Sequence, residues 1–365
     1  MVFGILDART LGLVGGVLLL LGAASIVVQV LRRRTDLGLD PGIIENLHRR
    51  VRAWLILFSG LAVAFIIGKT ATVVLFGLIA FWALREFITL TPTRPGDHRT
   101  LFWVFFLITP LQFVLVGMGW YELFSVLIPV YAFLLIPARI AISGDYKRFL
   151  ERTAKIQCGL LICVYCLSHA PALLVLRQGG NPAAATASGD TTGAAEAAGK
   201  TAATGTAEAA SADAKPAGPL VDIESDTYRN TRLLFFFVLM VQLSDVAQYL
   251  WAQVPSKHLI APSISAARTW EGLLGGTISA MLVGGALWWA TPFHGVWWWM
   301  AAVMSGVISL MGFAGGITMS AIKRDRGVKD YGTLIEGHGG VLDRIDSLCF
   351  AAPVFFHCTR MWLGN

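Results

Sequence analysis

Residues 11–31 read LGLVGGVLLLLGAASIVVQVL, an uncharged apolar run that three arginines follow directly at 32–34. A helix of this length rises about 30 Å, enough to cross the hydrocarbon core of a bilayer. Similar apolar segments recur at about 53–68, 70–90, 101–118, 120–142, 156–176, 232–253, 271–291, 296–318 and 347–363. Backbone N–H and C=O groups in hydrocarbon must pair within their own segment, which favours helices. The sequence therefore predicts an all-α, polytopic integral membrane protein with about ten transmembrane helices.

The composition also indicates a membrane protein. Of the 365 residues, 55% are hydrophobic and 14% are charged, whereas a soluble domain carries about 25% charged residues. The net charge of +6 comes from basic residues in the gaps between apolar segments, so no nucleic-acid partner is expected. The five cysteines lie in or beside apolar runs, at positions 158, 163, 166, 349 and 358. They are expected to be buried packing thiols and not a disulfide framework.

The basic gaps indicate the orientation of the chain. A cleaved signal peptide carries its basic residues before the apolar core, so we expect an uncleaved first helix with its amino end outside. Ten spans then place five gaps inside, at 32–52, 91–100, 143–155, 254–270 and 319–346, and these are the basic gaps. Positively charged loops stay in the cytoplasm. We therefore expect a bacterial inner (plasma) membrane protein whose active site faces the cytoplasm.

The chain divides into three regions by composition. Residues 1–176 hold the N-terminal transmembrane helices, and residues 231–365 hold the C-terminal transmembrane helices, expected to be the catalytic region. Residues 177–230 lie between them, and Ala, Gly and Thr dominate this stretch from 178 to 219. Such a segment has little to bury, so we expect a disordered, non-cytoplasmic loop without a catalytic role.

Asp245 is a carboxylate near the middle of an otherwise apolar segment. Gln242 and Gln248 lie three residues before and after it, so all three polar groups share one face of a helix. A charged side chain at membrane depth is costly and usually marks a functional or water-lined site. The alternative is a polar contact between helices with Asp245 protonated or paired. The cost argument favours a function for Asp245.

Ser265 and Thr269 precede the next apolar segment, in the gap at 254–270. Their hydroxyl groups and the free N–H groups of the helix start can bind an anion. The alternative is a simple N-cap. The predicted topology supports the anion site, because it puts this gap and the charged residues 320–346 on the same side of the membrane.

Residues 320–346 read SAIKRDRGVKDYGTLIEGHGGVLDRID, a charged and glycine-rich stretch between two apolar segments. Its cations, Lys323, Arg324 and Lys329 among them, can neutralise a polyphosphate. The Gly-His-Gly-Gly turn at 337–340 can bring backbone N–H groups close to the same phosphates. The alternative is an exposed loop whose charges pair with one another.

Asp343 and Asp346, at the end of this stretch, are three residues apart. On a helix they share a face and can bind Mg²⁺. Cations for a leaving diphosphate and carboxylates for a metal at the α-phosphate are what nucleotidyl transfer needs. The sequence therefore predicts phosphate chemistry with a divalent cation.

The pattern over 320–346 resembles the signature of the phosphatidate cytidylyltransferases (CDP-diacylglycerol synthases). The matching positions are Ser320, Lys323, Arg324, Lys329, Asp330, Gly332, His338, Gly339, Gly340, Asp343, Arg344 and Asp346. Asp245 and the segment from Lys257 to Gly272 resemble upstream motifs of the same family. The resemblance covers about 232–346, and the earlier helices match only in general layout.

The resemblance implies an enzyme that makes CDP-diacylglycerol and diphosphate from CTP and phosphatidate, with Mg²⁺ as cofactor. Its partners would be CTP and phosphatidate in the membrane, with a homodimer as a further option. Asp343 and Asp245 would be linked to the metal, with Asp346 a lesser candidate. The catalytic residues would be Asp343, Asp245, Lys323 and Lys329. The substrate-binding residues would be Ser320, Arg324, Arg344, His338, Gly339, Gly340, Ser265 and Thr269.

Four positions depart from the family pattern. Gly316 stands where the family commonly has an aspartate, which removes a candidate ligand from a two-metal arrangement. Arg268 stands for a usual lysine, Ala266 for a proline and Glu336 for a proline. These changes leave room for a branch with another lipid acceptor.

Two other functions remain open. A CTP-dependent kinase of a polyprenol-type lipid alcohol would need a base for a neutral hydroxyl and would release CDP. A membrane transporter is suggested by ten helices and an intramembrane Asp245, but internal repeats and broken helices near the midplane are typical of transporters. The sequence shows neither of these features.

Overall fold

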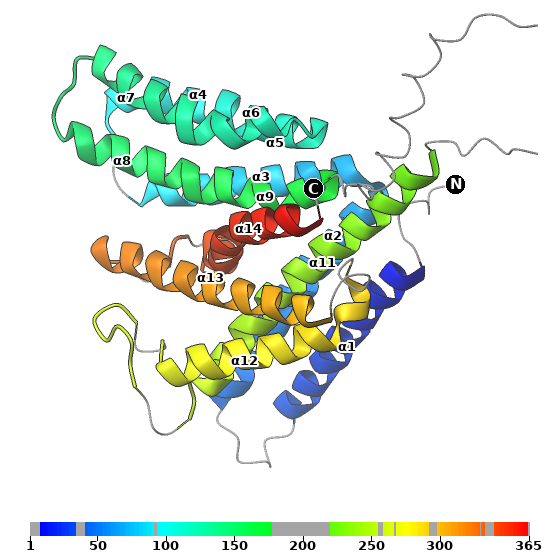
Figure 1. Cartoon of the computed structure of the whole chain (residues 1–365). Helices are drawn as coiled ribbons and strands as arrows, with labels where there is room; N and C mark the ends of the chain where they lie inside the picture. The colour runs from blue at the N-terminus through cyan, green and yellow to red at the C-terminus, as the bar shows by residue number, and fades with distance from the viewer. Residues whose placement is uncertain are drawn as a thin grey trace, which may run out of the picture.

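The computed structural model describes residues 8–33, 41–90, 93–176, 220–254, 258–265, 268–291, 298–328, 330–332 and 339–363 (Figure 1). Within these ranges the regular secondary structure is helical, apart from an isolated antiparallel bridge between Leu259 and Thr269 and a bridge residue at Gly339. The prediction of an all-α fold is confirmed.

The N-terminal region begins with α1 (Ala8–Arg33), α2 (Pro41–Ile67) and α3 (Lys69–Thr89). Three composite helices follow, and each contains a short π-helical segment. The first consists of η2 (Pro95–Asp97), α4 (His98–Trp103), η3 (Val104–Ile108) and α5 (Thr109–Met118). The second consists of α6 (Tyr121–Val126), η4 (Leu127–Ala132) and α7 (Phe133–Ile142). The third consists of α8 (Phe149–Gly159), η5 (Leu160–Cys166), α9 (Leu167–Ala172) and η6 (Leu173–Val175).

The C-terminal region consists of α11 (Leu220–Trp251), α12 (Trp270–Ala286), η7 (Trp288–Ala290), α13 (Trp298–Asp325) and α14 (Leu342–Leu363). Because α11 begins at Leu220, the last part of the predicted loop 177–230 is helical and the prediction of its end was wrong. Within α11, Asp245 lies in the last two turns. The rest of that loop, 177–219, lies outside the described residues.

A helix coincides with each of the ten predicted apolar segments. Seven of the described helical stretches are long and apolar enough to cross a membrane. They are Thr10–Val30, Lys69–Thr89, Pro95–Met118, Tyr121–Ile142, Phe149–Val175, Tyr228–Trp251 and Trp299–Asp325. The other three predicted segments are shorter or less apolar. The apolar part of α2, Trp54–Ile67, is short, and α12 has 17 residues. Helix α14 carries charged residues at both ends. The chain is a polytopic integral membrane protein.

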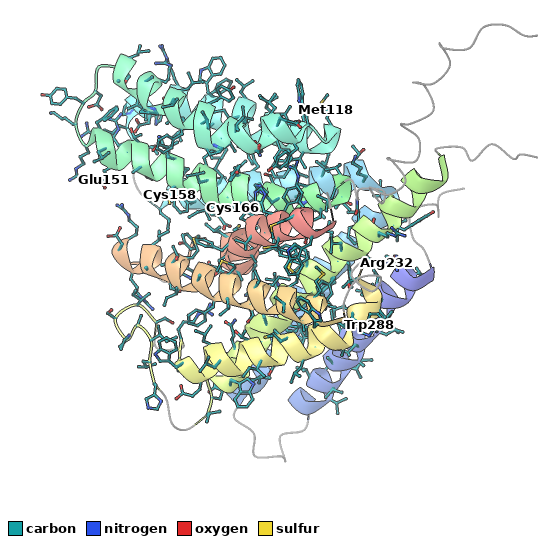
Figure 2. The ribbon with its side chains drawn as sticks, viewed as in Figure 1. Met118, Glu151, Cys158, Cys166, Arg232 and Trp288 are labelled. Atoms are coloured by element: carbon teal, nitrogen blue, oxygen red, sulfur yellow. The ribbon has the colours of Figure 1, made fainter. Side chains whose placement is uncertain are left out.

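The two ends of the helical bundle carry different groups, as Figure 2 shows. Glu151 lies at one end, where its carboxylate meets the Arg326 guanidinium at 3.3 Å. Met118, Arg232 and Trp288 lie toward the opposite end. The predicted inside gaps at 143–155 and 319–346 therefore meet at one end of the molecule, as an alternating topology requires.

The last helix, α14, lies at the centre of the fold (Figure 1). It packs against α13 and α11 on one side and against α9, η5 and α3 on the other. Phenylalanines fill the contact with α11, where Phe237 and Phe355 stack with their ring centres 5.0 Å apart. Because α14 touches both halves, the residues at its start can meet groups from the N-terminal and the C-terminal regions.

Glycines bring α12 close to α11. A Cβ at Gly276 would lie only 2.8 Å from the Cα of Gln248, so no larger residue fits there without moving a helix. Small residues let membrane helices approach closely where no hydrophobic force drives them together. The close contact sets the position of Gln248, which shares a helix face with Asp245.

Candidate active site

The carboxylates of Asp245 and Asp346 come together through one hydroxyl group. Ser347 Oγ donates a hydrogen bond to Asp245 Oδ1 at 3.0 Å and lies 3.5 Å from Asp346 Oδ1. The Ser347 backbone N–H donates to Asp346 Oδ1 at 2.8 Å. Asp245 is on α11 and the other two are in the first turns of α14, so the packing of these helices builds the pair. We call Asp245, Asp346 and Ser347 the carboxylate pair with its bridging serine.

Asp343 is the centre of a second group of contacts. Its Oδ1 accepts a hydrogen bond from Lys323 Nζ at 2.8 Å, and the two side chains form a mostly buried ion pair. Its Oδ2 accepts from the backbone N–H groups of Tyr331 and Gly340, at 2.9 and 3.0 Å. Asp343 thereby ties the end of α13 to the start of α14. A role as metal ligand stays a prediction, because three donors already surround its oxygens.

Glycine is required at position 339. Gly339 has a φ of +77°, in the left-handed region that side chains rarely adopt, and a Cβ there would lie 2.9 Å from Asp343 Oδ2. The neighbouring Gly340 supplies one of the N–H groups that Asp343 accepts. The Gly340 N–H binds the Asp343 carboxylate in this structure, and the approach of this turn to phosphates stays a prediction.

The sequence analysis missed Glu86, which α3 brings to the same place. This carboxylate is only 5% exposed and accepts hydrogen bonds from the backbone N–H groups of Val341 at 2.9 Å and Leu342 at 2.8 Å. The first N–H groups of a helix have no partner within the helix, so Glu86 caps α14 from the other half of the protein. A carboxylate inside the apolar segment 70–90 carries the same cost that singled out Asp245, and this signal could have identified it.

Arg268 extends the polar face of α11. Its Nη1 donates to Gln248 Oε1 at 3.0 Å, and Gln248 Nε2 donates to the backbone O and the hydroxyl of Ser309, both at 3.1 Å. The guanidinium lies 5.1 Å from the centre of the Phe313 ring. Burial raises the pKa of the Asp346 carboxyl, and the nearby positive charges of Arg268 and Lys323 oppose this rise. The predicted face with Gln248 and Asp245 is therefore part of one polar network.

The remaining predicted site residues take several positions. Ser320 Oγ donates to the Gly316 backbone O at 2.6 Å, and Arg324 Nε donates to the Ile264 backbone O at 3.2 Å. Thr269 is the N-cap of α12 and accepts from the Gly272 N–H at 3.0 Å, the alternative that the sequence left open. Ser265 lies in the turn after Ile264, and Arg344 lies in the first turn of α14. Lys329, Glu336 and His338 lie outside the described residues.

The described residues contain no group of three or more His, Cys, Asp and Glu side chains placed to hold a metal ion. Mg²⁺, however, usually takes one or two carboxylates together with waters and the phosphates of a substrate. The carboxylate pair of Asp245 and Asp346 meets that requirement. The residues present therefore fit a magnesium ion that arrives with a nucleotide. All five cysteines are free, and of these Cys163 and Cys349 are buried as expected, whereas Cys158, Cys166 and Cys358 are half-buried. Figure 2 labels Cys158 and Cys166 along the composite helix from α8 to α9.

Comparison with known proteins identifies the family. A model described as "Cytidylyltransferase family" matches residues 48–362. The chain is 34% identical over 319 residues to the uncharacterized protein YnbB of Escherichia coli K12, covering 85% of this chain and 86% of that protein.

Proteins named phosphatidate cytidylyltransferase match over a shorter range. Identity is 35% over 121 residues to the protein of Staphylococcus saprophyticus and 36% over 121 residues to that of Staphylococcus aureus strain COL. Each match covers 33% of this chain and 46% of the relative, so the matched part spans about half the length of these relatives. The resemblance predicted from residues 320–346 is confirmed at the level of the family. Because the family model matches most of its length, the chain belongs to the cytidylyltransferase family and is a nucleotidyltransferase.

Proposed function

We propose that this enzyme is a phosphatidate cytidylyltransferase, which transfers the cytidylyl group of CTP to phosphatidate. A phosphate oxygen of the lipid attacks the α-phosphorus of CTP. The bond from that phosphorus to the oxygen of the β-phosphate breaks, so diphosphate leaves and CDP-diacylglycerol stays in the membrane. The lipid phosphate is ionised at neutral pH, and the reaction needs no strong general base.

The carboxylate pair is the observation that carries this proposal. Two carboxylates that share one hydroxyl offer the one or two carboxylate ligands that Mg²⁺ takes together with the phosphates of a substrate. Asp245 and Asp346 would hold Mg²⁺, which supplies charge neutralisation and orientation at the α-phosphate. The pair lies at the start of α14 and near the end of α11, toward the end of the bundle that carries Glu151 and Arg326. This position supports the proposal, because a lipid headgroup and a soluble nucleotide can meet at a membrane surface.

The cations of the site suit the leaving diphosphate. Lys323 and Arg324 lie in the last turn of α13. Lys323 is oriented by Asp343, and a positively charged group near the β- and γ-phosphates stabilises the charge that develops as the diphosphate leaves. Lys329 would add a further cation. Further substrate contacts are proposed for Arg344, Ser265, Thr269, His338 and Gly339. We also propose that the protein lies in the bacterial inner membrane with this site facing the cytoplasm, and that it can form a homodimer.

Label transfer tests the reaction. Purified full-length protein in detergent is incubated with Mg²⁺, phosphatidate and CTP labelled either at the α- or at the γ-phosphate. We expect the α-label in a lipid product and the γ-label in diphosphate. A γ-label in the lipid together with released CDP, on a lipid-alcohol acceptor, would instead identify the lipid kinase. A panel of lipid phosphates in the same assay determines the acceptor.

A further inference from the structure

Arg268 is fixed within the polar network and not left to sample solvent. Its Nη1 donates to Gln248 Oε1 at 3.0 Å, and Gln248 is itself held by two hydrogen bonds to Ser309. The face of the Phe313 ring lies 5.1 Å from the guanidinium carbon, a cation–π distance. A guanidinium held on two sides in this way keeps one orientation.

Gly316 provides the space for this guanidinium. A Cβ at position 316 would lie 2.8 Å from Arg268 Cζ and still closer to Nη2. Gly316 is inside α13, and its φ is not positive, so space and not backbone conformation requires a glycine here. Arg268 and Gly316 therefore form a matched pair: a side chain at 316 and the present position of the guanidinium exclude each other.

The guanidinium of Arg268 lies near both members of the carboxylate pair. Its partner Gln248 is one turn after Asp245 on α11. The guanidinium also lies against Gly316, and a Cβ at the neighbouring Gly315 would be 2.8 Å from the backbone O of Asp346. Many phosphoryl-transfer sites balance their carboxylates with two divalent ions that clamp the attacking and leaving oxygens. A guanidinium can also stabilise the charge on a transferring phosphoryl group, and it matches two phosphate oxygens geometrically. In this protein the Arg268 guanidinium already puts a positive charge near the carboxylate pair.

We propose that Arg268 is a built-in cation of the active site that replaces a second divalent ion and binds a phosphate oxygen of the nucleotide. The enzyme then works with one divalent ion, held by Asp245 and Asp346. The identity of the nucleotide rests on the proposed function, whereas the ion count does not.

Equilibrium dialysis tests the proposal without turnover. Full-length protein in detergent is dialysed against radiolabelled Mn²⁺ and CTP in the absence of a lipid acceptor, with a protein-free chamber to correct for Mn²⁺ bound to free CTP. We expect one Mn²⁺ per chain at saturation. The double variant Arg268→Lys/Gly316→Asp introduces a carboxylate at position 316 and replaces the guanidinium by a shorter cation. We expect this variant to bind two Mn²⁺ per chain. Two ions on the unaltered protein would overturn the proposal, and so would a folded double variant that binds only one.

A second variant tests the matched pair. Gly316→Ala should displace the guanidinium and raise the Kd for CTP by about tenfold or more, because a charged hydrogen bond to phosphate is lost. Gly285→Ala on α12 is the control, since its Cβ would lie at an ordinary 3.4 Å from the Ala302 Cβ. An unchanged Kd in Gly316→Ala would overturn the proposal. If the unaltered protein binds no CTP, the proposed function fails, and the count with Mn²⁺ alone still decides the role of Arg268.

Discussion

Two carboxylates on apolar helices, Glu86 on α3 and Asp245 on α11, have different surroundings. Glu86 is almost fully buried and accepts the Val341 and Leu342 N–H groups. Asp245 is only partly buried, and it meets a second carboxylate through the Ser347 hydroxyl. A carboxylate that N–H groups satisfy serves as a cap, whereas two carboxylates that share one hydroxyl leave oxygens open to a further ligand. The comparison teaches that the partners of an intramembrane acid, and not its depth, distinguish a positioning residue from a proposed metal ligand.

The largest expected effect is on turnover in Asp245→Asn. Removing one carboxylate from the pair should lower kcat by at least about 100-fold, because the divalent ion loses a ligand. The thermal midpoint should change little, because the Asn side chain keeps an oxygen that can accept the hydrogen bond from the Ser347 hydroxyl. Label transfer and thermal unfolding in detergent measure the two effects. Near-normal turnover would show that Asp245 is only a polar contact between helices.

Asp343→Asn should also abolish most turnover in a folded protein. Asn retains one acceptor oxygen but no charge, so Lys323 loses its ion-pair partner and its orientation. We expect kcat to fall by about 100-fold. Asp325→Asn is the matched control at the end of the same α13, where the exposed carboxylate pairs with Arg326. Equal effects of the two substitutions would contradict a special role for Asp343.

Glu86→Gln should affect stability more than it affects chemistry. The amide retains one acceptor oxygen, so one of the two N–H groups at the start of α14 loses its acceptor, at a cost of about 1–3 kcal/mol. The thermal midpoint should therefore fall, and kcat should fall more than KM changes, because α14 carries both Asp343 and Asp346. The exposed Glu122→Gln on α6 is the control. A dead enzyme with an unchanged thermal midpoint would mean that Glu86 acts directly on substrate or metal.

The smallest effect is expected from deletion of residues 185–215. Their composition offers little to bury, so turnover should stay within about twofold of the unaltered protein. Label transfer on both proteins makes the comparison. A dead but folded deletion variant would show that this loop takes part in catalysis.

The sequence predicted the fold class and the chemical content of the site from one-dimensional signals. The period and length of apolar runs identified the helices, and the basic gaps indicated which ends meet. The polar face with Gln248 and Asp245 was visible at i, i+3 spacing because helical geometry alone determines it. The resemblance over 320–346 identified the family.

The partners of these residues could not be predicted, because tertiary packing decides them. Nothing in the sequence shows that Ser347 bridges Asp245 and Asp346, or that Glu86 caps a helix more than 250 residues later in the chain. The start of α11 was misplaced because its polar first turns carry no apolar signal. The alternative of a transporter loses its support, since the family to which the chain belongs consists of nucleotidyltransferases.

The central claim is that Asp245 and Asp346 together hold the divalent ion that positions CTP. An anomalous difference map of the protein crystallised with Mn²⁺ and CTP tests it most directly. The account predicts one peak between the two carboxylates, about 2.0–2.3 Å from an oxygen of each, with the nucleotide phosphates on its open side. An ion held by Asp343 without Asp245, or no ion at the carboxylate pair, would contradict it.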